Sequence, residues 1–295
     1  MSFEIWHAVV LGLVEGVTEY LPISSTGHLI IAADLMKLDT VEMRESVNAF
    51  NIVVQGGAIL AVVGLYWPRF VQMLRGLTGR DTAGLNLLVC LGIAFMPAAI
   101  AGVLLNDLIE KYLFSVSTVA IALVIGGLYM IVLEWWRRGK FSLPPHRKSQ
   151  LGLEDITPVK ALQIGLLQCI AMWPGTSRSM MTITGGYLVG LRPAAAAEFS
   201  FLLGVPTLTA ACGYRLFKNL KHAHETNLPN MIETLGVIPI VVGVVVAAVS
   251  AAAAVKFLVG TLNRSGLTPF GAYRIVLAIV LLGLVMQGIV SVNKS

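Results

Sequence analysis

Glu15 and Glu19 lie four residues apart within an otherwise apolar stretch of the sequence. In a helix, this spacing places both carboxylates on one face, one turn apart. Two close carboxylates in apolar surroundings influence each other's ionisation, and they hold hard cations well. The pair therefore predicts either an acid/base pair or a site for a divalent cation, Mg²⁺ or Ca²⁺. The alternative is that both groups are protonated or hydrogen-bonded to nearby hydroxyls and do no chemistry.

Three hydroxyl side chains and a histidine follow this pair, at Ser24, Ser25, Thr26 and His28. They come directly after Pro22, which interrupts a helix, and hydroxyls at such a point can simply cap the next helix. A histidine within reach of a serine also offers a general base or acid for phosphoryl or acyl transfer. We expect Ser25 and His28 to be catalytic together with the glutamates, and Ser24 and Thr26 to bind the substrate.

Arg178 is the next candidate, and it lies in a second polar interruption of an apolar segment. An arginine binds phosphate through a fork of two N–H donors. A glycine-containing turn that opens a half-helix adds backbone N–H donors and the positive end of the helix dipole. The alternative is that Arg178 only neutralises a glutamate, and this pairing would itself bring both interruptions to one site. The predicted anion-binding loop consists of Gly175, Thr176, Ser177, Arg178, Ser179 and Thr182.

The composition indicates what must hold these residues in place. Of 295 residues, 56% are hydrophobic and 13% are charged, and the mean hydropathy is +0.80, which is typical of a polytopic helical membrane protein. Six stretches are long and apolar enough to cross a bilayer: about 48–67, 85–105, 115–135, 195–214, 232–255 and 271–292. The net charge of +5 comes mostly from residues between these stretches, so we expect no nucleic-acid partner.

Two further apolar segments are interrupted near their centres: 5–33 at 22–27, and 161–190 at 174–179. Proline, glycine and hydroxyls at mid-membrane break a helix, so we predict two re-entrant helical hairpins. The segments share an order of residues in which Ser25 matches Ser177, which indicates an internal duplication. Three full crossings separate the hairpins, and an odd number inverts the second repeat. Inverted repeats of this kind place a binding site near the bilayer midplane.

We therefore predict an all-α polytopic membrane protein with one membrane domain, 1–295. It contains six full transmembrane helices plus two re-entrant hairpins in an inverted-topology repeat. Repeat 1 covers about 1–135 and repeat 2 about 155–292, and a basic loop at about 136–160 joins them on anionic membrane lipid. Twelve of the lysines and arginines at the ends of the spans fall on one side and seven on the other. The richer side is expected to be cytoplasmic, with both termini and the mouth of the first hairpin outside.

The motif residues resemble those of a known family. Glu15-x-x-x-Glu19 with Leu-Pro-Ile-Ser-Ser-Thr-Gly-His at 21–28, followed by Pro-Gly-Thr-Ser-Arg-Ser-x-x-Thr at 174–182, is similar to the signature motifs of the bacterial undecaprenyl-diphosphatases, the bacitracin-resistance family. The likeness covers nearly the whole chain. It implies an enzyme of the bacterial cytoplasmic (inner) membrane that removes the terminal phosphate from undecaprenyl diphosphate, a polyprenyl diphosphate lipid. The enzyme recycles the carrier for peptidoglycan synthesis and confers bacitracin resistance.

The same resemblance implies roles for individual residues. Glu15 and Glu19 correspond to the acidic pair of the motif and Ser25 and His28 to its loop serine and histidine. Its phosphate-contacting loop corresponds to Ser177, Arg178, Ser179 and Thr182. The resemblance also implies that activity depends on a divalent cation and that the active site faces the periplasm. Either Ser25 or a water activated by the cation would attack the phosphorus.

A secondary transporter or lipid flippase is the competing hypothesis, because inverted repeats with broken helices are also the transporter pattern. The gathering of hydroxyls, a histidine and paired carboxylates with an arginine favours an enzyme. A structural membrane scaffold would leave the buried charges unexplained. The sequence leaves open which metal binds, the prenyl length, the oligomeric state (a homo-oligomer included) and whether the protein also moves the lipid across the membrane.

Overall fold

The computed structural model describes residues 3–38, 43–113, 115–140, 151–226 and 231–290, and the regular structure in these ranges is helical. In chain order the α-helices are α1 Ile5–Glu19, α2 Ser25–Leu35, α3 Arg44–Leu65, α4 Trp67–Leu77, α5 Thr82–Leu113, α6 Val116–Arg137, α7 Pro158–Gln168, α8 Arg178–Leu188, α9 Pro193–Thr226, α10 Met231–Leu235, α11 Val237–Arg264 and α12 Thr268–Met286. Short 3-10 turns, η1 at Leu153–Asp155 and η2 at Cys169–Met172, precede and follow α7.

Six of these helices are long and apolar enough to cross a membrane, which confirms the predicted number of crossings. The candidate spans are Ser46–Leu65, Thr82–Leu105, Val116–Arg137, Pro193–Lys218, Val237–Arg264 and Thr268–Met286. The protein is therefore a multi-pass helical membrane protein. The predicted fifth span began too early, because Gly236 has a φ of 80° and ends the preceding helix α10 before α11 starts.

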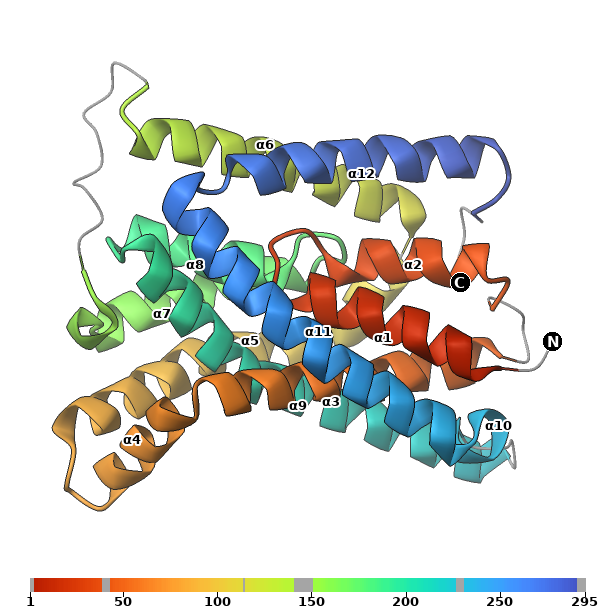
Figure 1. Cartoon of the computed structure of the whole chain (residues 1–295), viewed down its shortest axis with the longest axis horizontal. Helices are drawn as coiled ribbons and strands as arrows, with labels where there is room; N and C mark the ends of the chain where they lie inside the picture. The colour runs from red at the N-terminus through yellow and green to blue at the C-terminus, as the bar shows by residue number, and fades with distance from the viewer. Residues whose placement is uncertain (1–2, 39–42, 114, 141–150, 227–230, 291–295) are drawn as a thin grey trace.

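Both predicted interruptions are breaks between short helices. The chain leaves α1 at Glu19 and enters α2 at Ser25. It leaves η2 at Met172 and enters α8 at Arg178. In Figure 1, α1 and α2 occupy the end of the molecule where the chain termini lie, and α7 and α8 occupy the opposite end. The two breaks therefore meet near the middle of the long axis.

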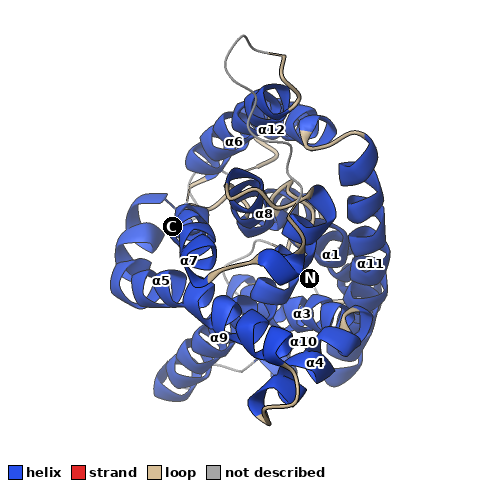
Figure 2. Ribbon diagram, turned by 90° about the vertical axis from the view of Figure 1, so that its left-hand side faces the viewer, coloured by secondary structure: helices blue, strands red, loops and turns tan. Residues whose placement is uncertain are grey.

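The packing partners of the helices form a crossed pattern. α1 packs mainly against α11, and α7 packs mainly against α5. α6 packs mainly against α12, and α3 packs against both α11 and α9. Viewed from the end, α8 lies near the centre with α6 and α12 together on one side of it (Figure 2). The first helix of each broken segment, α1 or α7, is thus supported mainly by a helix from the other half of the chain.

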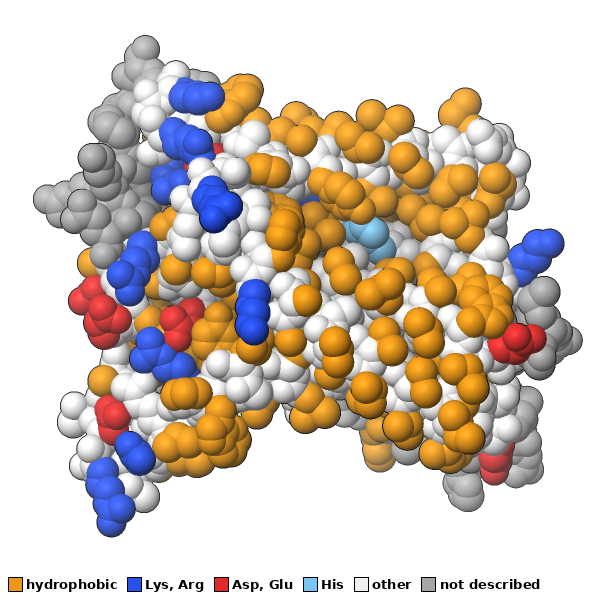
Figure 3. Space-filling view, in the orientation of Figure 1, with side chains coloured by type: hydrophobic (Ala, Val, Ile, Leu, Met, Phe, Trp, Pro, Cys, Tyr) orange, Lys and Arg blue, Asp and Glu red, His pale blue; other side chains and the backbone are white. Residues whose placement is uncertain are grey.

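The outer surface separates apolar and basic regions. Large apolar side chains are exposed along the long face of the molecule, while lysines and arginines gather at the end that holds α4 and the C-terminal end of α6 (Figure 3). A lateral face of this kind suits the hydrocarbon of a bilayer, and the basic end suits lipid headgroups. Residues 141–150 of the predicted basic loop lie outside the described residues.

Candidate active site

Glu19 and Ser25 flank the first break and are hydrogen-bonded to each other. The Ser25 hydroxyl donates to Glu19 Oε2 over 2.8 Å. Glu15 lies one turn earlier on α1, and the two glutamates are only 2% and 7% exposed. Gln55 of α3 hydrogen-bonds to Glu15. The proton of the Ser25 hydroxyl therefore already points at a carboxylate that can accept it.

Ser24 performs the capping that the sequence left as an alternative for this group of hydroxyls. Its Oγ accepts the N–H of Gly27 at 3.5 Å and caps α2. Its φ of 72° is an uncommon, left-handed conformation for serine. Ser177 repeats the arrangement before α8, with a φ of 75° and an Oγ that accepts the N–H of Met180 at 3.3 Å. Because Ser24 is the cap, the Ser25 hydroxyl is left to bond Glu19.

A hydrogen bond joins the two breaks directly. The Ser179 hydroxyl donates to the Leu21 carbonyl over 2.9 Å, across 158 positions of sequence. Ser177 Oγ lies 3.0 Å from Ser179 Oγ, and it donates to that oxygen because the Ser179 proton is already committed to Leu21. Two segments far apart in the chain are thus held side by side. The site contains residues from both.

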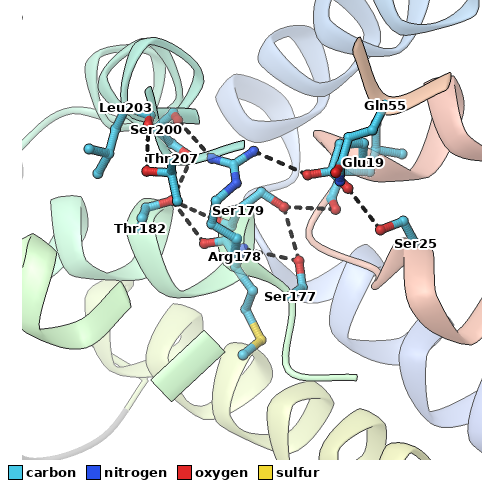
Figure 4. Close-up of polar contacts among 12 residues, drawn as sticks. Glu19, Ser25, Gln55, Ser177, Arg178, Ser179, Thr182, Ser200, Leu203 and Thr207 are labelled. Carbon is cyan, nitrogen blue, oxygen red and sulfur yellow. Dashed lines mark hydrogen bonds and ion pairs between the residues drawn. The ribbon is translucent and has the colours of Figure 1, made fainter. Parts of the chain in front are cut away.

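Arg178 reaches from the start of α8 toward both α9 and α1 (Figure 4). Its Nη1 donates to the Ser200 carbonyl over 3.0 Å. Its Nη2 lies 3.6 Å from Glu19 Oε1, which is close enough for charge attraction but too long for a hydrogen bond. The guanidinium also lies over the Tyr20 ring, 5.5 Å from its centroid.

The edge of the Arg178 guanidinium that carries Nε and Nη2 is open in the sense that it makes no hydrogen bond among the described residues. Nε and Nη2 are buried, and neither has a hydrogen-bond partner among the described residues. These two nitrogens form the fork that binds two oxygens of a carboxylate or a phosphate. Buried donors without partners are rare in folded proteins. The open fork is therefore the clearest ligand-binding feature of the site.

The other residues of the predicted anion-binding loop shape its backbone. Gly175 has a φ of 94°, and a Cβ there would lie 2.8 Å from the Val119 carbonyl oxygen, so this position requires glycine. The Thr182 hydroxyl donates to the Arg178 carbonyl over 2.9 Å and lies 2.6 Å from Ser200 Oγ. Thr176 is buried. Contact of these residues with substrate stays a prediction.

Comparison with known proteins identifies the family. Residues 8–280 match the family described as bacitracin resistance protein BacA. The chain belongs to the BacA family. It is 42% identical to the undecaprenyl-diphosphatase of Desulfovibrio desulfuricans over 92% of this chain and 94% of that protein. It is 40% identical to the one of Geobacillus kaustophilus over 94% and 97%, and 43% identical to the one of Sorangium cellulosum over 95% and 86%.

The BacA-family match spans both breaks, but the structure does not bring every predicted site residue together. His28 Nδ1 lies 2.7 Å from the Ser24 carbonyl, and Nε2 lies 2.8 Å from the Tyr273 hydroxyl. The two rings are stacked, with centroids 5.6 Å apart. Both ring nitrogens are thus engaged away from Ser25. A catalytic role for His28 stays a prediction, as does substrate binding by the half-buried Thr26.

The acidic pair of this BacA-family site suits a hard cation. Glu15 and Glu19 contact each other, and two such carboxylates need a proton or a cation between them. Glu15 Oε1 is buried and has no partner among the described residues, so one oxygen is free to act as a ligand. No group of three or more histidine, cysteine or acidic side chains suited to a metal is present in the described part of the chain. A cation such as Mg²⁺ keeps water or phosphate oxygens as its other ligands.

Sequence reasoning missed two residues that complete this BacA-family site. The Ser200 carbonyl accepts a hydrogen bond from Arg178 Nη1, and the Ser200 hydroxyl lies 2.6 Å from the Thr182 hydroxyl. Arg274 of α12 is fully buried beside both breaks. A charged residue inside an apolar span was the available signal for Arg274. Glu198 of α9, two residues before Ser200, forms an ion pair with Arg69 of α4 at 2.7 Å.

Proposed function

We propose that the protein is an undecaprenyl-diphosphatase. It hydrolyses undecaprenyl diphosphate to undecaprenyl phosphate and inorganic phosphate, returns the lipid carrier to peptidoglycan synthesis and confers bacitracin resistance. Relatives of nearly the same length carry that name. The observation that carries the proposal is the open Arg178 fork in the same site as the hydrogen-bonded Ser25 and Glu19.

Substrate binding begins at the arginine. The terminal phosphate would accept hydrogen bonds from Nε and Nη2 of Arg178, which satisfies two buried donors at once. The bond from Nη1 to Ser200 keeps the guanidinium in place before substrate arrives, so little reorganisation is needed during the reaction. The N-termini of α2 and α8 add positive potential. The polyprenyl tail would lie between helices in the lipid.

The hydrogen bond between Ser25 and Glu19 indicates how the attack starts. Glu19 accepts the hydroxyl proton while Ser25 Oγ forms a bond to the terminal phosphorus. The phosphoanhydride bond breaks, and undecaprenyl phosphate leaves. The proton that Glu19 took leaves with this product, so the carboxylate is free again. A water then attacks the phosphorus of phosphoserine while Glu19 takes a proton from it. The bond between Ser25 Oγ and phosphorus breaks, the proton returns from Glu19 to Ser25 Oγ, and inorganic phosphate is released. In the alternative, a water attacks the substrate directly and Ser25 only positions it.

Glu15 and Glu19 are the residues that would hold a divalent cation, Mg²⁺ or Ca²⁺. Such an ion, when bound, supplies positive charge against the phosphate oxygens. Glu15 contributes the unpartnered Oε1. One oxygen of Glu19 accepts the hydrogen bond from the Ser25 hydroxyl. Glu15 would therefore serve mainly to compensate the charge of the cation, and Glu19 would also accept the proton.

We further infer the predicted topology, a single domain of two inverted repeats with re-entrant hairpins. The crossed packing of α1 on α11 and α7 on α5 supports it, since an exchange of equivalent helices is what a two-fold relation between repeats produces. The two positive-φ serine caps support it as well. The basic end would be cytoplasmic, which orients the first hairpin toward the periplasm in a bacterial inner membrane.

A transporter or flippase is not favoured as the main activity. Binding alone does not require a serine whose proton is held by a buried carboxylate next to an open phosphate fork. The names of the relatives also describe hydrolysis.

The test is the release of inorganic phosphate from undecaprenyl diphosphate by purified protein in detergent. The parent chain is compared with Arg178→Ala and with Arg264→Ala, an exposed arginine at the end of α11. Each variant is assayed with Mg²⁺, with Ca²⁺ and after chelation. We expect turnover by the parent and by Arg264→Ala, and a loss of about 100-fold or more for Arg178→Ala. A folded parent that releases no phosphate would overturn the proposal. Turnover that is unchanged by chelation would show that no divalent cation takes part in the reaction.

A further inference from the structure

Arg274 makes a set of hydrogen bonds that no other described arginine makes. It lies in α12, its side chain is fully buried, and no described carboxylate forms an ion pair with it. All its acceptors are backbone carbonyl oxygens. Nε donates to Leu123 over 3.3 Å, Nη1 to Pro22 over 3.5 Å, and Nη2 to Ala122 and Gly175 over 2.9 and 2.8 Å.

A buried charge without a counter-ion is costly, so simple packing of α12 does not explain an arginine here. Several carbonyl dipoles compensate the charge. Two of them come from the middle of α6, where glycine lets the guanidinium approach. A Cβ on Gly126 would lie 2.5 Å from Arg274 Nη2. The glycine at position 126 of α6 thus leaves the space that the Arg274 guanidinium occupies.

The other two carbonyls belong to the two breaks. Pro22 lies two residues before the cap Ser24, and Gly175 lies two residues before the cap Ser177. One planar, rigid group therefore contacts both breaks at the same distance in sequence from a serine in a left-handed conformation. Movement of either break relative to the other would stretch at least one of these bonds.

We propose that Arg274 is a positioning residue that sets the separation between the two breaks, and through them the distance from Ser25 to the Arg178 fork. It touches no reacting atom. Ser179, which bonds to the Leu21 carbonyl, is the second connection between the breaks. The inference rests on the proposed function, because Ser25 and Arg178 must act on one phosphate for their separation to matter.

The first experiment measures kinetics. Arg274→Lys keeps the charge but cannot serve four acceptors in one plane, and Arg274→Met keeps the length without charge. We expect kcat for phosphate release to fall by about 10- to 100-fold in both, as expected for misplacement by about 1 Å, while KM changes far less. Gly271→Ala is the packing control, since its Cβ would lie 2.7 Å from the Gly127 carbonyl on α6 and none of its three nearest atoms belongs to Arg274.

The second experiment needs no activity. Hydrogen exchange of the backbone amides is compared in peptides that cover 20–25 and 173–178. In Arg274→Lys, we expect exchange in both peptides to rise together, whereas in Gly271→Ala it should rise mainly in α6 and α12. Ile279→Ala, an exposed position of α12, should leave both regions at the parent level.

Three outcomes would overturn the proposal. One is a folded Arg274→Lys with kcat within about two-fold of the parent. Another is unchanged exchange in either break. The third is an equal loss of kcat in Gly271→Ala at a matched melting temperature. If Arg274→Met does not fold, Arg274→Lys decides. If the parent releases no phosphate, the proposed function fails, and the exchange data alone test the coupling of the breaks.

Discussion

Gly204 allows α9 to pass close to the Arg178 guanidinium, and a methyl group there should displace it. A Cβ at Gly204 would lie 2.8 Å from Nη1 and 3.0 Å from both Cζ and Nη2. Non-bonded heavy atoms prefer about 3.5–4.0 Å. In Gly204→Ala, the guanidinium must therefore move by roughly 0.5–1 Å, away from the helix whose Ser200 carbonyl holds it.

The expected effect is a loss of catalysis with the fold retained. A displacement of about 1 Å in a positioned group lowers the rate by up to about 100-fold, which corresponds to about 2.7 kcal/mol at 1.36 kcal/mol for each factor of ten. We expect kcat/KM to fall by about 10- to 100-fold. Alanine also favours a helix interior over glycine by about 0.5–1 kcal/mol, and this gain offsets part of the strain, so the protein should still fold.

The assay is phosphate release from undecaprenyl diphosphate, with thermal unfolding measured on the same samples. Gly213→Ala is the matched control, because it is the same substitution on the same helix and no described atom lies within 4 Å of its Cβ. It should raise the melting temperature slightly and keep the parent activity. Gly204→Ala with kcat/KM within about two-fold of the parent would refute the placement of Arg178 beside α9.

Three further outcomes test other parts of the site and the fold. Arg178→Lys should lose about 100-fold or more in kcat/KM, because an ammonium group cannot form the two-donor fork; near-normal turnover would contradict phosphate binding through Nε and Nη2. Ser25→Ala should abolish the phosphoserine that rapid acid quenching traps in the parent and reduce turnover by at least about 1000-fold, and a variant that keeps its activity would leave water as the nucleophile. Gly266→Ala should lower the free energy of unfolding by about 1–3 kcal/mol, since its φ is 68° and its Cβ would collide with the Glu134 carboxylate. The activity per folded molecule should not change, and an unaltered melting temperature would show that this turn tolerates a side chain.

Much of the architecture could be predicted from local sequence. Hydropathy over about 20 residues decides whether a helix can cross a bilayer, and six such helices are present. Pro22 and Gly175 cannot continue a regular helix, so the two breaks lie where they were predicted. Spacing alone placed Glu15 and Glu19 on one face of α1. These features depend on neighbours in the chain, which a sequence displays directly.

Contacts between the breaks could not be derived in this way. The sequence left open whether Arg178 binds a phosphate or only neutralises a glutamate. The structure places Nη2 3.6 Å from Glu19 Oε1 and leaves Nε and Nη2 without a hydrogen-bond partner among the described residues. In the structure, His28 forms a hydrogen bond with Tyr273, 245 positions away, although His28 is only three residues from Ser25. No local pattern encodes which side a ring faces when its partner lies in the last helix.

The sequence by itself determined which residues carry groups that could react and which segments are apolar, because residue type and short-range periodicity carry that information. Only the tertiary structure decided which hydroxyl caps a helix, which one bonds a carboxylate, and which arginine keeps buried donors without a hydrogen-bond acceptor. The physical reason is that each of these assignments depends on long-range packing. Arg274 shows this most clearly, since it lies in an apolar span and its four acceptors belong to α6 and to two distant breaks.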